Sequence, residues 1–221
     1  VQCDYGKKPD TPTPEPTKAP TETVVYTFDG WSTAKDSQGT ALTSIPETTG
    51  NATYYAHFTP STRYYTVSAT ANPTAGGTVS GSGSSYKWND SVTLEASANY
   101  GYTFVKWTDN GADAGTATTY SIPIDGNHTV VAEFEKNSYT VTLEASEGGQ
   151  ATIDKTTCLY EDQVTVAATA DTGYTFVNWV QDGQVVSSDP TYTFTVTADS
   201  TVKPVFSINS YTISLSSDGN G

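Results

Sequence analysis

The sequence predicts an all-β protein made of small β modules in tandem. Of its 221 residues, 35% are hydrophobic and 12% are aromatic, with 15 tyrosines. This composition, together with abundant Thr, Ser and Val, favours half-buried strands over helices. No window longer than a few residues has the i, i+3, i+4, i+7 apolar spacing of an amphipathic helix. A repeated aromatic phrase indicates the tandem arrangement.

The aromatic phrase occurs three times. It reads YTFDGW at 26–31, GYTFVKW at 101–107 and GYTFVNW at 173–179. In every copy a second landmark ends in a phenylalanine 27 positions after the tryptophan of the phrase. The pairs are Trp31 with Phe58, Trp107 with Phe134, and Trp179 with Phe206. Active sites are rarely written three times, so each copy is expected to fill the core of its own module.

These landmarks divide the chain into modules. Module one covers 1–61 and lacks its first strand, module two covers 64–136, module three covers 138–208, and 210–221 is the first strand of a truncated fourth module. In module one, Tyr5 takes the place of Tyr86 and Tyr160 ahead of the same core strand. Four residues, 135–138, separate the closing Phe of module two from the opening Tyr of module three. Another four, 207–210, do the same between module three and the fourth module. Linkers that short predict an elongated, semi-rigid rod.

The proline-rich segment 7–23 has two interpretations. Its composition is typical of a disordered linker. Its position inside module one instead indicates an ordered, irregular loop. The sequence leaves both open.

Strand alternation predicts how each module packs. In YTVTLEA, the apolar residues Tyr139, Val141, Leu143 and Ala145 share one face and the polar residues share the other. One apolar and one polar face is typical of an antiparallel sheet packed on one side. Pro204 cannot donate a ladder hydrogen bond, so its strand is expected to lie at an edge or to be bulged there.

The aromatic phrase breaks this alternation. Its Phe and Trp are three positions apart, so a flat strand would send them to opposite faces. If both are core residues, one extra residue must be absorbed between them. We expect a β-bulge or a sharp bend at the position before each Trp, namely Gly30, Lys106 or Asn178.

Taken together, GYTFVKW, the later TVVAEF at 129–134 and the preceding YTVSATANPTAGGTVSGSG at 65–83 resemble the internalin-type B-repeat superfamily. Modules two and three look like its divergent branch. Module one is similar to the shorter branch, although Val25 replaces the first Gly of the phrase. The resemblance implies a β-grasp-like or sandwich-like module on secreted or wall-anchored bacterial proteins. It also implies work as a stalk or an adhesive segment, with no catalytic motif.

Charge and cysteine content exclude several functions. Ten basic and 24 acidic residues give a formal net charge of −14, and no basic stripe exists, so a nucleic-acid partner is excluded. No apolar run approaches the roughly 18 residues of a membrane span. Cys3 and Cys158 fall at corresponding places of different modules, so a disulfide between them is not expected.

Few residues are candidates for a site. His57 and His128 are expected to be exposed and polar, and we expect no catalytic residue, metal site or cofactor. Trp88 has no aromatic counterpart in the segment YEDQ of module three, so it is free to lie on the surface. Exposed aromatic rings beside Asn and Asp often bind sugars, and Tyr100 is a second candidate. The alternative is local packing over the hairpin.

Two functions follow. The leading hypothesis is a non-enzymatic stalk or spacer of an extracellular, cell-surface or secreted bacterial protein, with neighbouring modules as partners. The alternative is a ligand-binding adhesin segment that recognises a glycan or a host protein. In addition, Tyr211–Ser216 is expected to add as a strand to the open sheet of another copy.

Overall fold

The computed structural model describes residues 1–216 and Gly219, and it confirms the all-β class. Within these residues the helical elements are two three-residue 3-10 turns, η1 (Lys35–Ser37) and η2 (Thr74–Gly76). The strands are β1 (Val24–Ser32), β2 (Tyr55–Thr62), β3 (Tyr65–Asn72), β4 (Gly77–Ser80), β5 (Gly83–Tyr86), β6 (Ser91–Ala98), β7 (Tyr102–Asp109), β8 (Ala112–Gly115), β9 (Thr119–Pro123), β10 (His128–Lys136), β11 (Ser138–Leu143), β12 (Gly149–Ile153), β13 (Thr157–Leu159), β14 (Gln163–Ala170), β15 (Tyr174–Gln181), β16 (Gln184–Ser187), β17 (Thr191–Thr195) and β18 (Ser200–Ile208).

The chain divides into two compact units. Unit one comprises Val1–Thr70, Val79–Ala96 and Lys106–Ala132, and unit two comprises Ala71–Thr78, Ser97–Val105 and Glu133–Gly221. The division passes through β3, β4, β6, β7 and β10, all within the predicted module two. The module boundaries drawn from the sequence therefore stay a prediction.

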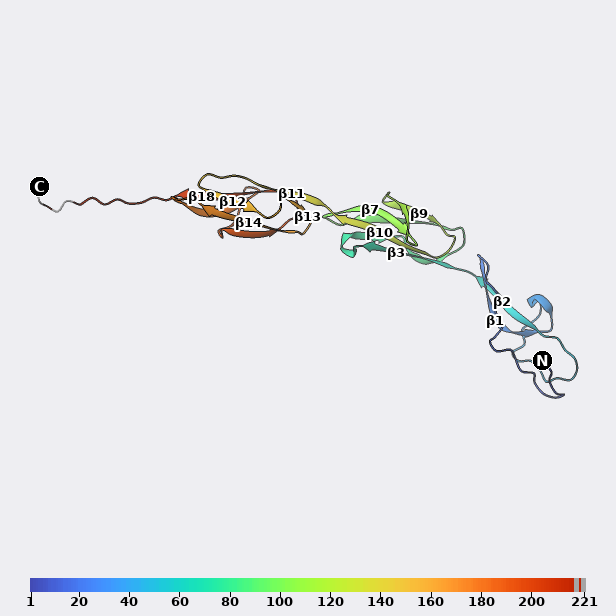
Figure 1. Ribbon diagram of the computed structural model, residues 1–221. Helices are drawn as coiled ribbons and strands as arrows, with labels where there is room; N and C mark the ends of the chain where they lie inside the picture. The colour runs from blue at the N-terminus through green and yellow to red at the C-terminus, as the bar shows by residue number, and fades with distance from the viewer. Residues whose placement is uncertain (217–218, 220–221) are drawn as a thin grey trace. The chain divides into compact units, whose positions relative to one another are not determined.

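In unit two, the strands of module three form two sheets around one core (Figure 1). The five-stranded sheet has the order β13-β11-β18-β15-β16, and the three-stranded sheet has the order β12-β14-β17. The core takes buried side chains from both sheets, among them Val141, Val164, Trp179 and Val202. Of the two forms expected, β-grasp-like and sandwich-like, the sandwich-like form therefore describes module three. The strands of module two have the same orders, β5-β3-β10-β7-β8 and β4-β6-β9.

One pairing departs from the antiparallel sheet expected from the sequence. The first and last strands of module three, β11 and β18, pair in parallel over Val141–Leu143 and Ser200–Val202. Pro204 comes two residues after this parallel pairing ends at Val202, and it pairs with Trp179 of β15 on the other side. Pro204 therefore lies beyond the end of β11, where its missing N–H interrupts no ladder. The strand is central in the sheet but locally an edge at this residue.

The expected bulge is present, one residue earlier than predicted. Between β15 and β18, Phe176 faces Phe206 and Asn178 faces Val205, so Val177 is the extra residue. The same shift in β1 makes Asp29 the extra residue. The bulge returns both the Phe and the Trp of the phrase to the inner face, as the phrase requires.

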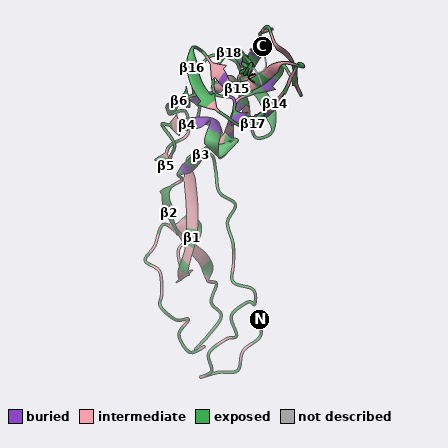
Figure 2. Cartoon of the chain, turned by 90° about the vertical axis from the view of Figure 1, so that its left-hand side faces the viewer, coloured by how far each residue is buried: buried purple, intermediate pink, exposed green. Residues whose placement is uncertain are grey.

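Burial follows the bulge in modules two and three but not in module one. Trp107 and Trp179 are 0% exposed, whereas Trp31 is only half-buried. Among the strands of the described residues β1 pairs with β2 alone, apart from a single bridge from Trp31 to Leu42, and two strands without a second sheet bury little apolar surface. Figure 2 shows this pair in the colours of intermediate and exposed residues. The rings of module one still pack on one another, with Phe28 5.7 Å from Trp31 and 5.8 Å from Phe58, but Trp31 is less buried than its counterparts.

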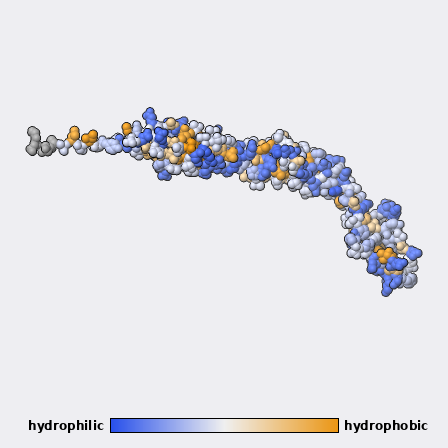
Figure 3. Space-filling view, in the orientation of Figure 1, coloured by the Kyte–Doolittle hydropathy of each residue, from blue (hydrophilic) through white to orange (hydrophobic). Residues whose placement is uncertain are grey.

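Cys3 and Cys158 are both free, as expected. The segment that follows β18 has no regular structure over residues 209–216. Its apolar side chains Ile213 and Leu215 are exposed. Figure 3 shows hydrophobic residues in orange along this C-terminal segment. The fourth-module strand and its addition to another copy stay predictions, and residues 217–218 and 220–221 of that segment lie outside the described residues.

Candidate interaction site at the joint between modules two and three

An aromatic cluster within unit two joins the end of module two to the start of module three. The Tyr160 ring packs edge to face against two other rings. Its centroid lies 5.7 Å from that of Tyr100, with 80° between the ring planes, and 5.8 Å from that of Tyr102, with 70° between the planes. Between them lies Gly101, where any Cβ would overlap the Tyr160 ring. Gly101 also has a φ of +81°, which favours glycine. Glycine at this position is what lets the backbone approach the ring.

Hydrogen bonds fix the backbone around this ring. The Tyr160 N–H donates to the Asn137 carbonyl (2.9 Å), and the Asn137 N–H donates to the Gly101 carbonyl (2.8 Å). The Thr103 hydroxyl donates to the Asn137 side-chain oxygen (2.6 Å), which orients the linker residue. The Tyr100 hydroxyl donates to the Thr197 carbonyl (3.0 Å). The short linker is thereby bonded on both sides.

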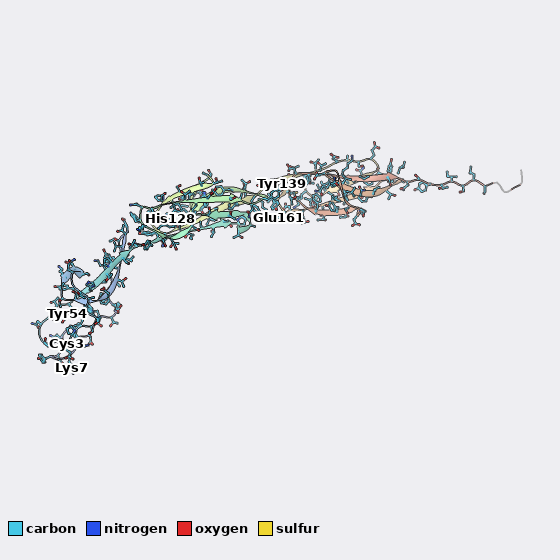
Figure 4. All side chains as sticks on the ribbon, turned by 180° about the vertical axis from the view of Figure 1, so that it is seen from behind. Cys3, Lys7, Tyr54, His128, Tyr139 and Glu161 are labelled. Atoms are coloured by element: carbon cyan, nitrogen blue, oxygen red, sulfur yellow. The ribbon has the colours of Figure 1, made fainter. Side chains whose placement is uncertain are left out.

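An ion pair adds little to this joint. Lys136 Nζ lies 3.2 Å from Glu161 Oε2, and both side chains are substantially exposed. Figure 4 labels Glu161 close to Tyr139, at the start of module three. Exposed pairs contribute about 0–1 kcal/mol. Each aromatic pair contributes about 0.5–1.5 kcal/mol beyond the area that it buries. The rings, more than the charges, therefore hold the joint.

A tight turn presents the Tyr160 ring. In Leu159–Asp162, the Asp162 N–H donates to the Leu159 carbonyl (3.0 Å), and Glu161 has a φ of +67°. The Asp162 carboxylate accepts from Lys155 Nζ (3.0 Å) and from the Leu159 N–H (3.1 Å). These two donors, Lys155 first, hold the pKa of Asp162 below its usual value, and Asp162 in turn raises the pKa of Lys155.

The same turn recurs in the other modules. In each turn, one partner residue elsewhere in the module makes two backbone hydrogen bonds. Its carbonyl accepts from the N–H of the third turn residue, and its N–H donates to the carbonyl of the fourth. The partner is Val196 for Glu161 and Asp162, Ile124 for Asn89 and Asp90, and Thr48 for Gly6 and Lys7, at 2.8–2.9 Å throughout. The aromatic second residues are therefore Tyr160, Trp88 and Tyr5.

This equivalence corrects the alignment made from the sequence. Trp88, not Tyr86, is the counterpart of Tyr160, because Tyr86 pairs with Tyr65 as Cys158 pairs with Tyr139. Module two has two more residues than module three between the first strand and the turn. Matching tyrosine to tyrosine hid this difference. The shared pattern of an aromatic residue two positions before Asp90 or Asp162 is the signal that would have found it.

The structure places the two binding candidates in different units. Trp88 belongs to unit one and is half-buried, and its ring lies 5.9 Å from that of Tyr65. The Tyr65 hydroxyl donates to the Glu22 carbonyl (2.8 Å), and the Arg63 guanidinium lies over the Tyr65 ring. Tyr100 belongs to unit two and is 69% exposed, although its hydroxyl is bonded. Local packing, the alternative weighed for Trp88, describes its surroundings.

Residues 65–138 and 139–210 match the family described as "Divergent InlB B-repeat domain", and residues 2–57 match the family described as "Listeria-Bacteroides repeat domain". The chain belongs to the divergent InlB B-repeat family. The resemblance stated from the motifs is thus confirmed. The B-repeat chain is also similar to a protein of Evansella cellulosilytica described as "Putative Gly-rich membrane protein", at 26% identity over 198 residues. The match covers 88% of this chain but only 22% of that relative's length.

Module two contains a buried polar cluster that the sequence did not predict. His128 is only 9% exposed, with Nδ1 2.7 Å from Asp109 Oδ2 and Nε2 3.2 Å from Asp125 Oδ1. The Tyr120 hydroxyl donates to Asp109 (3.2 Å), and burial, then Asp109, raises the pKa of Tyr120. The expectation of an exposed His128 is wrong because it opens β10 on the inward face, in phase with Val130.

Module three has neutral side chains at the positions where module two has charged ones. Tyr192 donates to Gln181 (3.4 Å), as Tyr120 donates to Asp109. Ser200 is the counterpart of His128, because each comes directly before a threonine that makes the same hydrogen bond. The Thr201 N–H donates to Asp182, and the Thr129 N–H donates to Asn110. The cluster is therefore a replacement within a shared core position. Among the described residues, no group of three His, Cys, Asp or Glu side chains is placed to hold a metal ion.

The other histidine, His57 of β2, is also less exposed than expected, with 13% of its side chain accessible. His57 Nδ1 is 2.6 Å from Asp29 Oδ1, and the Thr59 hydroxyl donates to Asp29 Oδ2 (2.5 Å). Thr59 first, and His57 second, lower the pKa of Asp29. This contact depends on the bulge, which turns Asp29 toward the neighbouring strand. In residues 1–216 and at Gly219, no helix has the length and apolar character to cross a membrane.

Proposed function

We propose that the chain is a non-enzymatic spacer of a bacterial surface protein, in which joined B-repeats hold another part of the protein away from the cell. Membership of repeat families typical of surface proteins supports this proposal and an extracellular location. The observation that carries it is the joint at Tyr160, because a spacer needs neighbouring modules that resist bending. The semi-rigid rod expected from the short linkers is part of the proposal.

The joint gives the proposal a physical mechanism. One residue, Asn137, separates β10 from β11; so short a connection restricts reach, but it does not by itself fix orientation. Tyr160 contacts Tyr100 and Tyr102 on one side, while the Asn137 backbone is bonded to both modules. Bending there requires both the ring contacts and these hydrogen bonds to break together.

Small-angle scattering and ligand screening test the function together. The intact chain should scatter as an extended particle, and Tyr160→Ser should broaden its distribution of dimensions. Tyr55→Ser, at an exposed tyrosine within β2, should not. A compact profile for the unaltered chain would contradict the spacer. In parallel, binding of the chain to a glycan or host-protein panel, lost in Trp88→Ala, would favour the adhesin segment instead.

A further inference from the structure

The outer face of the five-stranded sheet in module three carries an apolar patch. Trp179 and Pro204, which face each other across β15 and β18, are both buried, so the residues next to them in each strand point outward. Outward-facing valines therefore gather on β15, β16 and β18. They are Val177, Val180, Val185 and Val205. We call these four valines the valine patch.

Solvent reaches much of the valine patch. Val185 is 67% exposed and Val177 is 40% exposed, while Val180 and Val205 are half-buried. Single exposed apolar residues are common on protein surfaces. Apolar residues that adjoin on three neighbouring strands instead indicate a surface that contacts a partner.

A buried polar atom lies within the valine patch. Asn178 follows Val177 in β15 and lies opposite Val205 in β18. Its side-chain Oδ1 is out of reach of solvent and accepts no hydrogen bond from the described residues. A buried carbonyl oxygen without a donor costs about 1–3 kcal/mol. A partner that offers an amide N–H to Asn178 would remove this cost.

Module two has charged side chains where module three has this patch. Lys106 precedes its tryptophan as Asn178 does in module three, and Asp113 has the strand position of Val185. Lys106 Nζ and Asp113 Oδ1 form an ion pair at 2.6 Å. The fold therefore accepts an ion pair at these two positions, and the apolar surface of module three is not required for folding.

Carboxylates are absent from the five strands of the module three sheet, β11, β13, β15, β16 and β18. Their one charged residue is Lys203. Glu144 lies beside it at the end of β11, where the Glu144 N–H donates to the Val202 carbonyl (2.9 Å). The face therefore has no net charge, although the chain has a formal net charge of −14. Surplus carboxylates elsewhere repel a second copy, whereas two such faces can meet without repulsion.

We propose that the valine patch binds the valine patch of a second copy, in a two-fold symmetric dimer with the two Asn178 side chains at the axis. An amide has both a donor and an acceptor, so it matches a second copy of itself. Once each amide turns about its Cβ–Cγ bond, Nδ2 of one Asn178 donates to Oδ1 of the other, and the valines surround this pair.

The symmetry of the contact limits the assembly. Both copies use the same surface, so the contact is isologous and stops at a dimer. The patch is three strands wide, with strands about 4.8 Å apart, and covers much less than the roughly 800 Å² per partner of a stable interface. Dimerisation should therefore be weak and concentration-dependent. The proposal goes beyond the spacer function and does not depend on the joint at Tyr160.

Sedimentation velocity of the intact chain over a range of concentrations tests the proposal. Asn178→Lys combined with Val185→Asp places in module three the ion pair that module two already holds, so the fold is kept and the patch becomes charged. This double variant should weaken dimerisation by at least about tenfold, because both charges would lose water in the interface. Val177→Lys should do the same. Its matched control is Val105→Lys, at the same position of the aromatic phrase in module two and 36% exposed, which should dimerise like the unaltered chain.

Side-chain amide NMR signals test the role of Asn178 in the same samples. They should shift with rising concentration in the unaltered chain and stay constant in Val177→Lys. A chain that stays monomeric, or patch variants that associate like the unaltered chain, would overturn the proposal. Association that is lost only on replacing Ile213 and Leu215 with Ser would also overturn it, in favour of strand addition. A monomeric chain that binds an apolar dye, with binding lost in Val177→Lys, would assign the valine patch to a different partner and equally overturn the dimer.

Discussion

Gly101→Ala tests whether the joint depends on close approach of backbone and ring. Alanine at a φ of +81° costs about 1–2 kcal/mol in backbone strain. Its Cβ would also displace the Tyr160 ring and with it two aromatic contacts, each of about 0.5–1.5 kcal/mol. Gly173→Ala is a matched control within the same chain, because it has the same strain and an empty surrounding. The difference between the variants should be about 1–3 kcal/mol.

Amide hydrogen exchange measures that difference at the joint itself. The Tyr160 N–H is bonded to Asn137 in the linker, whereas the Glu161 N–H is bonded to Val196 inside module three. Gly101→Ala should lower the protection of the Tyr160 amide about 5- to 150-fold relative to Gly173→Ala. Protection of the Glu161 amide should be unchanged. Equal protection of the Tyr160 amide in both variants would refute the role of the ring contact.

Three further predictions follow from the described contacts. His128→Ser should destabilise the chain by about 1–3 kcal/mol in urea unfolding, because the half-buried Asp109 carboxylate loses a partner, and adding Asp109→Gln should restore most of the loss. No restoration would contradict the view that the charged cluster replaces neutral groups at a shared position. Asp162 has a lowered pKa, so the stabilisation that its carboxylate gives is complete above the unfolded carboxyl pKa and is lost as pH falls through the folded pKa. In Asp162→Asn, the unfolding midpoint should therefore depend less steeply on pH over that acidic range. An unchanged dependence on pH would exclude the effect. Trp88→Ala should lower the thermal midpoint of unfolding through lost ring packing, and an unchanged midpoint would show the ring contributes nothing.

Repetition made most of the fold predictable. The equal distance from Trp to Phe in three copies located the strands that pair in the structure, and the three-residue step from Phe to Trp required the bulge found at Val177. Both inferences rest on strand geometry, which acts over a few residues. The parallel pairing of β11 and β18 joins strands far apart in the sequence, and no local pattern encodes it.

Three residues show where sequence reasoning stopped. His128 was expected to be exposed because it ends DGNH, which reads as a turn, yet its phase with Val130 already placed it on the inner face. Trp31 was expected to be buried because the phrase is shared, but burial needs a second sheet that β1 and β2 do not receive. Trp88 was misaligned because aromatic identity was followed instead of the turn that presents the ring.

Residual dipolar couplings test the central claim most directly. If the Tyr160 ring fixes the joint, one alignment tensor should fit the amides of residues 97–105 in module two and of residues 163–170 in module three, which both belong to unit two. In Tyr160→Ser, the two groups should require different tensors. Different tensors in the unaltered chain, or a single shared tensor in the variant, would contradict the account.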